Sequence, residues 1–145
     1  MFKHLLIPTD GSTLSDLTVR NGLKLAKSLG ARVTVLASSR PFQVVTAHPV
    51  MLSQTREEYE KDVEVRARAS LELARDTAHA ASVRCDTTHV VSARPHEAII
   101  ATAQARNCDV VFMASPDREG VAAILLGSET QKVLSRSKLP VVLWR

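Results

Sequence analysis

Short β-rich apolar runs alternate along this chain with longer helical segments, and this alternation restricts the fold more than any other feature. Strands are expected at residues 4–8, 33–37, 84–91, 109–114 and 140–144. Helices are expected at residues 13–29, 55–81, 97–105 and 128–136. Continuous apolar strands separated by helices are typical of a parallel sheet that is covered on both faces.

This order predicts an α/β fold with three α/β/α layers, doubly wound around a five-stranded parallel sheet with right-handed crossovers. A chain of 145 residues suits one domain, residues 1–145, with one core. In such sheets ligands bind beyond the carboxyl ends of the strands. The segments expected at that edge are residues 9–12, residues from 38 onward and residues 115–128.

The two longest helices have recognisable ends and faces. Asp10 or Ser12 can cap the helix at 13–29, and Gly30 is its expected stop. Its expected apolar face consists of Leu14, Leu17, Leu23, Ala26 and Leu29. The helix at 55–81 repeats apolar residues at a helical spacing: Tyr59, Val63, Ala67, Leu71, Ala74 and Ala78. Its charges are mixed in sign, which is typical of a solvated face.

Residues 39–54 break all periodicity. A loop of this length in a compact domain is usually functional or mobile. We expect it to form a mobile flap near the carboxyl edge of the sheet, with Phe42, Val44 and Val45 able to close over a ligand or to contact a partner.

Charge and composition argue against nucleic acid and membrane as partners. The net charge is +4, and the excess is thinly spread over residues 1–54, whereas residues 55–145 are balanced. Aromatic residues make up only 3% of the chain and are scattered, so there is no stacking platform for single strands. No apolar run approaches the roughly 20 residues that cross a bilayer. No secretory signal is apparent at the amino terminus, so we expect a cytoplasmic protein.

The two cysteines, Cys85 and Cys108, have neither a disulfide framework nor a metal-ligand spacing. We expect two half-buried thiols in a reducing compartment.

Two places carry candidate binding chemistry. Asp10 directly follows the first strand, where a carboxylate can bind ligand hydroxyls or cap the next helix. Gly127 and Ser128 precede the last helix, whose open N–H groups make an anion site or an ordinary cap with Ser128 at the N-cap. His96 is interpreted as structural or solvated, and no catalytic constellation is convincing. We therefore expect no enzymatic activity.

Several segments together resemble the universal stress protein family, and the match spans nearly the whole chain apart from residues 39–54. The matching segments are residues 3–12 (KHLLIPTDGS), 30–36 (GARVTVL), 94–99 (RPHEAI), 108–115 (CDVVFMAS), 125–134 (LLGSETQKVL) and 140–143 (PVVL). The resemblance implies an adenine nucleotide alpha hydrolase-like fold, a homodimer, and a role in stress response.

The resemblance also implies an adenine-nucleotide site with the pattern G-x2-G-x9-G-[ST], which falls here on Ala114, Asp117 and Gly127-Ser128. The implied binding residues are Pro8, Thr9, Asp10, Ser38, Met113, Ala114, Ser115, Asp117, Gly127, Ser128 and Glu129. ATP is the ligand that this site would take, although no cofactor is assigned with certainty.

This chain departs from the pattern at the first two glycines. Asp117 restricts the backbone and adds a carboxylate where a phosphate is expected, and Pro116 removes an N–H donor. Ala37 and Ser38 replace the His-Val that is common after the second strand, which makes the adenine wall less apolar. The sequence therefore predicts a degenerate site with weak ATP binding or none.

Two alternatives stay open: an ATP-binding protein that acts as a nucleotide-dependent switch, and a dimeric interaction module without nucleotide that recognises an unknown protein partner. An enzyme of the same superfamily would carry an SGGxDS-type loop, which residues 9–12 do not match. The homodimer is expected to form through the apolar strand at 140–144, which would otherwise leave an exposed sheet edge.

Overall fold

A computed structural model describes residues 1–42, 54–115 and 127–144. The elements follow in the order β1 (His4–Thr9), α1 (Thr13–Leu29), β2 (Arg32–Ser39), α3 (Arg56–Ala80), β3 (Cys85–Val91), α4 (Pro95–Ala105), β4 (Val110–Ala114), α5 (Ser128–Arg136) and β5 (Val141–Trp144). Each expected strand and helix is present, and its ends lie within about two residues of the expected positions.

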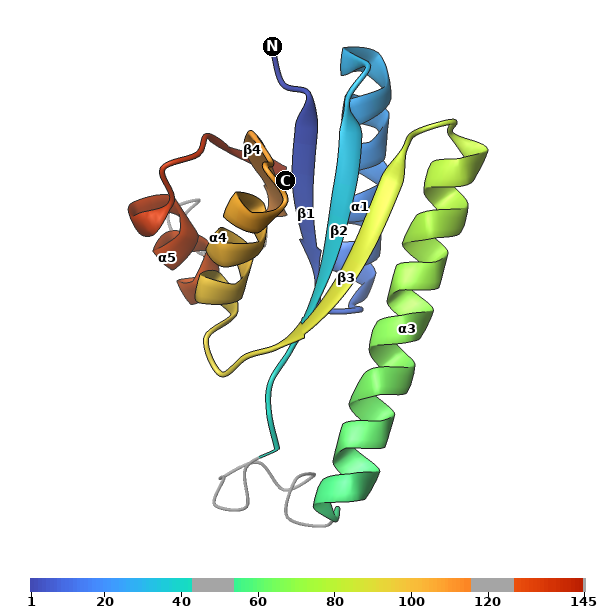
Figure 1. Ribbon diagram of the computed structural model, residues 1–145, viewed down its shortest axis with the longest axis vertical. Helices are drawn as coiled ribbons and strands as arrows, with labels where there is room; N and C mark the ends of the chain where they lie inside the picture. The colour runs from blue at the N-terminus through green and yellow to red at the C-terminus, as the bar shows by residue number, and fades with distance from the viewer. Residues whose placement is uncertain (43–53, 116–126, 145) are drawn as a thin grey trace, which may run out of the picture.

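The strands form one parallel sheet in the order β3-β2-β1-β4-β5 (Figure 1). The register pairs His4 with Arg32 at the start of β1 and Thr9 with Ala37 at its end. The chain moves outward from β1 to β3 on one side, then crosses to β4 and β5 on the other. This reversal places the topological switch point between β1 and β4, as expected for a doubly wound sheet.

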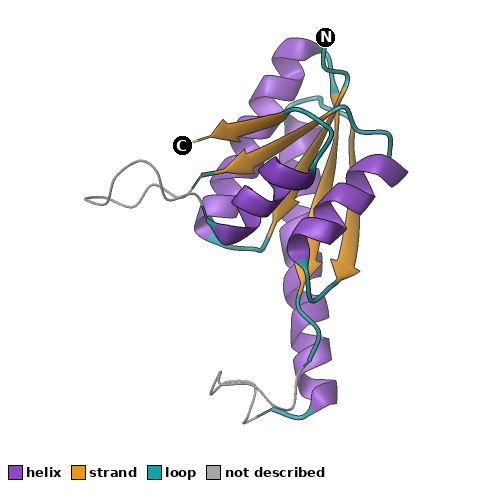
Figure 2. Cartoon of the chain, turned by 90° about the vertical axis from the view of Figure 1, so that its left-hand side faces the viewer, coloured by secondary structure: helices purple, strands orange, loops and turns teal. Residues whose placement is uncertain are grey.

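Helices α1 and α3 pack on one face of the sheet, and α4 and α5 pack on the other (Figures 1 and 2). Leu5, Ile7 and Phe112 belong to the core on the side of α1 and α3. Leu6 and Val111 alternate to the other face and pack in the core that includes Ile99 of α4 and Val133 of α5. The three-layer α/β/α prediction is therefore confirmed.

Helix α1 begins and ends where its local chemistry requires. The Ser12 Oγ accepts a 3.2 Å hydrogen bond from the backbone N–H of Ser15, so Ser12 is the N-cap. Gly30 ends the helix at φ 64°, a left-handed conformation that favours glycine.

The expected apolar face of α1 is only partly right. Its buried residues are Thr18, Val19, Gly22, Leu23 and Ala26. Leu14, Leu17 and Leu29 are each at least 36% exposed, because the helix presents the side that holds Gly22 to the sheet. A Cβ at position 22 would overlap the Ile7 side chain, so glycine allows this close approach.

Helix α3 matches its expected pattern fully. All six of the residues in the predicted apolar stripe are buried: Tyr59, Val63, Ala67, Leu71, Ala74 and Ala78. Thr55 and Glu58 form a capping box at its start. The amino-terminal half of α3 extends past the carboxyl edge of the sheet, beside the segment that leaves β2 (Figure 1).

Ser39 lies in β2, so the aperiodic segment begins one residue later than expected. Of that segment the structure describes only residues 40–42 and 54. The expectation of a mobile flap falls mainly on residues 43–53, outside the described residues.

Candidate functional site

The carboxyl ends of β1, β2 and β4 meet at one edge of the sheet, beside the topological switch point. The turn after β1 needs a glycine. Gly11 lies at φ 81° and donates from its backbone N–H to the Thr9 Oγ1 at 3.2 Å. Glycine adopts this left-handed conformation at low cost, whereas other residues rarely do.

Asp10 presents an ionised carboxylate at this edge. Its Oδ1 accepts hydrogen bonds from the backbone N–H of Ser12 at 2.9 Å and from the Ser15 Oγ at 2.6 Å. Burial raises the pKa of Asp10, but the hydrogen bonds from Ser12 and Ser15 outweigh it and hold the pKa below its usual value. The carboxylate is thus oriented by the start of α1 without being its N-cap.

A cavity of about 410 Å³ opens at the switch point, lined by residues from the start of α1 and from α4 and α5. Seven of the predicted site residues line it: Pro8, Thr9, Asp10, Ser38, Met113, Ala114 and Glu129. Leu14 and Ile99 add apolar wall. We refer to this space as the switch-point cavity. It combines an apolar wall with a few polar groups, as small-molecule sites do.

The remaining predicted residues are placed elsewhere or lie outside the described residues. Ser115 is buried, and its backbone N–H donates to the Trp144 carbonyl at 2.8 Å. Gly127 is the N-cap of α5 and Ser128 its first helical residue, so the expectation of Ser128 as N-cap is wrong by one position. No side-chain hydrogen bond caps this helix, because Gly127 has no side chain to supply one. Asp117 lies outside the described residues.

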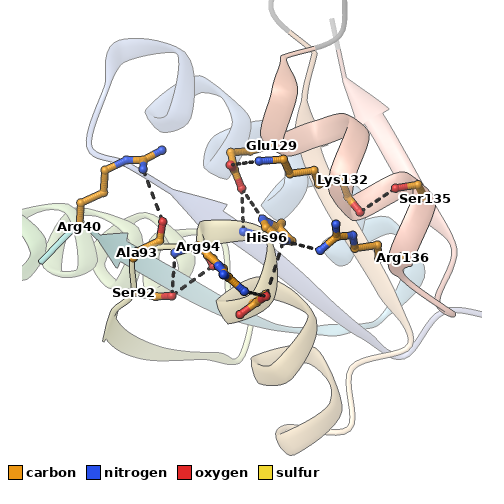
Figure 3. Close-up of polar contacts among 10 residues, drawn as sticks. Arg40, Ser92, Ala93, Arg94, His96, Glu129, Lys132, Ser135 and Arg136 are labelled. Carbon is orange, nitrogen blue, oxygen red and sulfur yellow. Dashed lines mark hydrogen bonds and ion pairs between the residues drawn. The ribbon is translucent and has the colours of Figure 1, made fainter.

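Glu129 enters the cavity from the first turn of α5 and is held from behind by α4 (Figure 3). Its Oε2 accepts from the His96 backbone N–H at 2.8 Å and lies 2.9 Å from the His96 Nδ1. Its Oε1 lies 3.4 Å from the Lys132 Nζ. Burial raises the pKa of Glu129, but these hydrogen bonds outweigh it, and the pKa is lowered overall.

Arg40 is a cation at the wall of the ligand space, and sequence reasoning did not single it out. It lines the switch-point cavity, and its Nη1 lies 3.5 Å from the carbonyl oxygen of Ala93, in the loop between β3 and α4 (Figure 3). Its own carbonyl accepts a 2.8 Å hydrogen bond from the Tyr59 hydroxyl of α3. Its position shortly after the second expected strand, at the edge where ligands bind, could have indicated Arg40 as a binding residue.

A second cavity, of about 590 Å³, lies on the opposite side of the sheet between α1 and α3. It shares Thr9, Asp10, Ser38 and Arg40 with the switch-point cavity. The Ser38 Oγ is buried and has no hydrogen-bond partner among the described residues, so it can bond to a ligand on this shared wall.

The described residues offer neither a metal centre nor a reactive thiol. No group of three or more histidine, cysteine or acidic side chains among them could hold a metal ion. Cys85 is half-buried and Cys108 buried, and both thiols are free. Burial raises the pKa of each thiol to about 11. Within the described ranges, no helix is long and apolar enough to cross a membrane.

Comparisons with known proteins agree on one family. The model of the Universal stress protein family matches residues 1–145. A universal stress protein of Thermus aquaticus is 27% identical over 145 residues, which cover 100% of both chains.

Solved structures give the same result for the fold. A universal stress protein in complex with cAMP superposes with a TM-score of 0.74 at 23% identity, covering 99% of this chain and 97% of that one. The Archaeoglobus fulgidus universal stress protein in complex with dAMP gives a TM-score of 0.68 at 16% identity, with 100% and 98% covered. The sheet and its flanking helices have the adenine nucleotide alpha hydrolase-like fold of these proteins.

Proposed function

This chain belongs to the universal stress protein family, and we propose that it is a non-enzymatic stress-response protein that binds an adenine nucleotide in the switch-point cavity. We propose further that it binds a nucleoside monophosphate better than ATP. One observation carries this proposal: a single cavity collects seven residues that sequence resemblance had assigned to nucleotide binding.

The nucleoside end of the cavity suits adenosine. Pro8, Ile99 and Met113 offer apolar surface to a flat base. The oriented carboxylate of Asp10 can accept hydrogen bonds from ribose hydroxyls, and the unpaired Ser38 Oγ can bond to a ring nitrogen. The volume of about 410 Å³ lies in the usual range of small-ligand sites. Two structural neighbours are complexes with cAMP and with dAMP, both of which carry one phosphate.

The phosphate end has fewer favourable features. The open N–H groups of α5 after Gly127 attract an anion. The sequence places Asp117 at a glycine position of the family pattern and Pro116 directly before it, which adds a charge and reduces the freedom of the backbone. One phosphate can use the helix terminus, whereas a triphosphate must also pass these groups. This charge arrangement supports weak ATP binding.

The experiment is a calorimetric titration of the purified protein with adenosine, AMP and Mg-ATP at one fixed salt concentration. We expect AMP to bind more tightly than ATP, and guanosine monophosphate to bind more weakly than AMP. Binding of ATP more tightly than AMP would contradict the selectivity. Absence of binding by all adenine compounds would contradict the nucleotide function.

We propose that the protein is a cytoplasmic homodimer that pairs through β5. This strand lies at the edge of the sheet, with the apolar residues Val141, Val142, Leu143 and Trp144 half-buried. An uncovered apolar edge strand is prone to pairing, and a two-fold contact would cover it.

The second candidate is a dimeric interaction module that binds a protein partner without nucleotide. Loss of the first two glycines of the phosphate pattern, at Ala114 and Asp117, favours it. A dimer that binds no adenine compound in the titration would support this candidate over the first.

A further inference from the structure

The buried His96 stands at the centre of a partly buried polar network that joins α4 to α5 (Figure 3). Its exposed fraction is only 3%. On one side of the ring, Nδ1 lies 2.9 Å from the Oε2 of Glu129. On the other side, Nε2 lies 3.0 Å from the Nη1 of Arg136. The ring thus connects the two ends of α5, since Glu129 lies in its first turn and Arg136 ends it.

These two neighbours fix which ring nitrogen carries the proton. The guanidinium of Arg136 can only donate, so Nε2 must accept. The carboxylate of Glu129 can only accept while ionised, so Nδ1 must donate. The network therefore selects the neutral imidazole with its proton on Nδ1. Together with its backbone N–H, His96 aims two donors at the same carboxylate oxygen.

The position of Glu129 makes this arrangement relevant to the ligand. Its side chain lines the switch-point cavity, and it follows Gly127 and Ser128 at the helix end that attracts an anion. A mobile carboxylate there would compete with a phosphate for the open N–H groups of α5 and would repel it. A carboxylate held against α4 by His96 does neither.

We propose that His96 is a positioning residue that keeps the Glu129 carboxylate away from the phosphate of the bound nucleotide. This inference rests on the proposed nucleotide binding in the switch-point cavity. It assigns to His96 an effect on the phosphate end of the ligand and none on the nucleoside end.

The test compares AMP and adenosine binding by calorimetry in wild type, His96→Ala, His96→Asn, Glu129→Gln and the double variant His96→Ala/Glu129→Gln. His96→Ala should weaken AMP binding about tenfold, which corresponds to about 1.4 kcal/mol, and should leave adenosine binding unchanged. His96→Asn retains a side-chain N–H donor and should restore most of the AMP affinity. The double variant should also restore it, because the repelling charge is gone. His89→Ala is the control, since His89 bonds to Ser39 and does not line this cavity.

The outcomes separate this inference from the proposed function. If wild type binds no adenine compound, both fail. If wild type binds AMP, two results would overturn the inference alone and show that His96 is only structural. One is that His96→Ala weakens AMP and adenosine binding equally. The other is that the loss of AMP affinity persists in the double variant. If His96→Ala does not fold, ¹H–¹⁵N correlation spectra of the wild-type imidazoles decide. A proton on Nδ1 of His96 supports the inference, and a proton on Nε2 overturns it.

Discussion

The Ser15 hydroxyl lies 2.6 Å from the Oδ1 of Asp10, and this hydrogen bond ties the carboxylate at the end of β1 to the first turn of α1. The backbone N–H of Ser12 reaches the same oxygen. Asp10 also lines the cavities on both sides of the sheet edge. The orientation of Asp10 is therefore set before any ligand arrives, which lowers the entropic cost of binding.

Replacement of Asp10 by alanine should weaken adenosine and AMP binding by the same factor. The carboxylate is expected to accept from the ribose, which both ligands share, and a hydrogen bond to a charged group contributes about 1.5–3 kcal/mol. Calorimetric titration measures the effect. Asp16→Ala is a matched control, because Asp16 is an acidic residue in the first turn of α1 and does not line the switch-point cavity. A loss confined to AMP would show that Asp10 does not contact the nucleoside.

Glu129 should make stability depend on pH in acid. Its pKa in the folded protein is below the ordinary value of 4.5, so the ionised form stabilises the fold above that pH. This contribution is lost as the pH falls below 4.5 and passes through the lowered pKa. Urea unfolding between pH 7 and pH 3 should show a smaller acid loss for Glu129→Gln than for wild type. Glu64→Gln, which alters an exposed ion pair with Arg68, should behave as wild type.

Gly22→Ala should destabilise the protein by about 1–3 kcal/mol, the usual cost of overpacking a core. The new methyl group would overlap the Ile7 side chain and lie 3.0 Å from Phe112 Cδ1. Alanine is the better helix former, so propensity alone would give the opposite sign. Chemical denaturation at pH 7 measures the change, with the exposed Lys24→Ala of the same helix as control. A stability gain at position 22 would mean that α1 sits further from the sheet.

The order of the elements could be read from the sequence because short β-rich runs alternate with longer segments of helical periodicity. The α3 stripe was also readable, since Tyr59 through Ala78 recur at helical spacing and one helix face suffices to bury them. The face of α1 was harder to predict. Leu14 and Leu17 look like core residues, yet Gly22 rests against the sheet and leaves these leucines partly exposed. A helix face that contacts the sheet through a glycine cannot be recognised from a hydrophobic pattern, because glycine has no side chain to contribute to it.

The candidate site was predictable only in part. Pro8, Thr9 and Asp10 follow a strand, and the rule for parallel sheets places them at the ligand edge. The pairing of His96 with Glu129 joins residues that are 33 positions apart, and no local spacing predicts it. Glu97 is adjacent to His96 in the sequence, yet its Oε1 lies 4.0 Å from the His96 Nε2. It is therefore farther from the ring than Glu129 is.

Leu143→Pro should convert the expected homodimer into a monomer without unfolding the chain. The carbonyls of Pro140 and Trp144 accept from β4. Backbone groups alternate along a strand, so the N–H of Leu143 points away from β4, toward the open edge. Proline is tolerated at such an edge position, yet it removes a donor that a pairing strand needs. Light scattering at micromolar concentration measures the mass. A monomeric wild type would contradict the dimer itself.

Pro116→Gly combined with Asp117→Gly should strengthen Mg-ATP binding. Both positions lie outside the described residues, and the argument rests on their chemistry in the family pattern. The double change adds one backbone N–H donor, frees φ at position 117 and removes a negative charge. At about 4 Å and an effective dielectric constant near 20, a contact between two like charges costs about 4 kcal/mol before screening by salt. Removal of even ~1.4 kcal/mol of this repulsion raises affinity tenfold.

AMP binding is the internal control for that double substitution, because AMP lacks the β- and γ-phosphates that the changed residues are expected to meet. Its affinity should therefore rise less than that of ATP. Asp10→Ala in the same background should weaken the restored ATP binding, since the nucleoside end is held separately. A wild type that already binds ATP with sub-micromolar affinity, unchanged by the double substitution, would show that Asp117 does not face the phosphates.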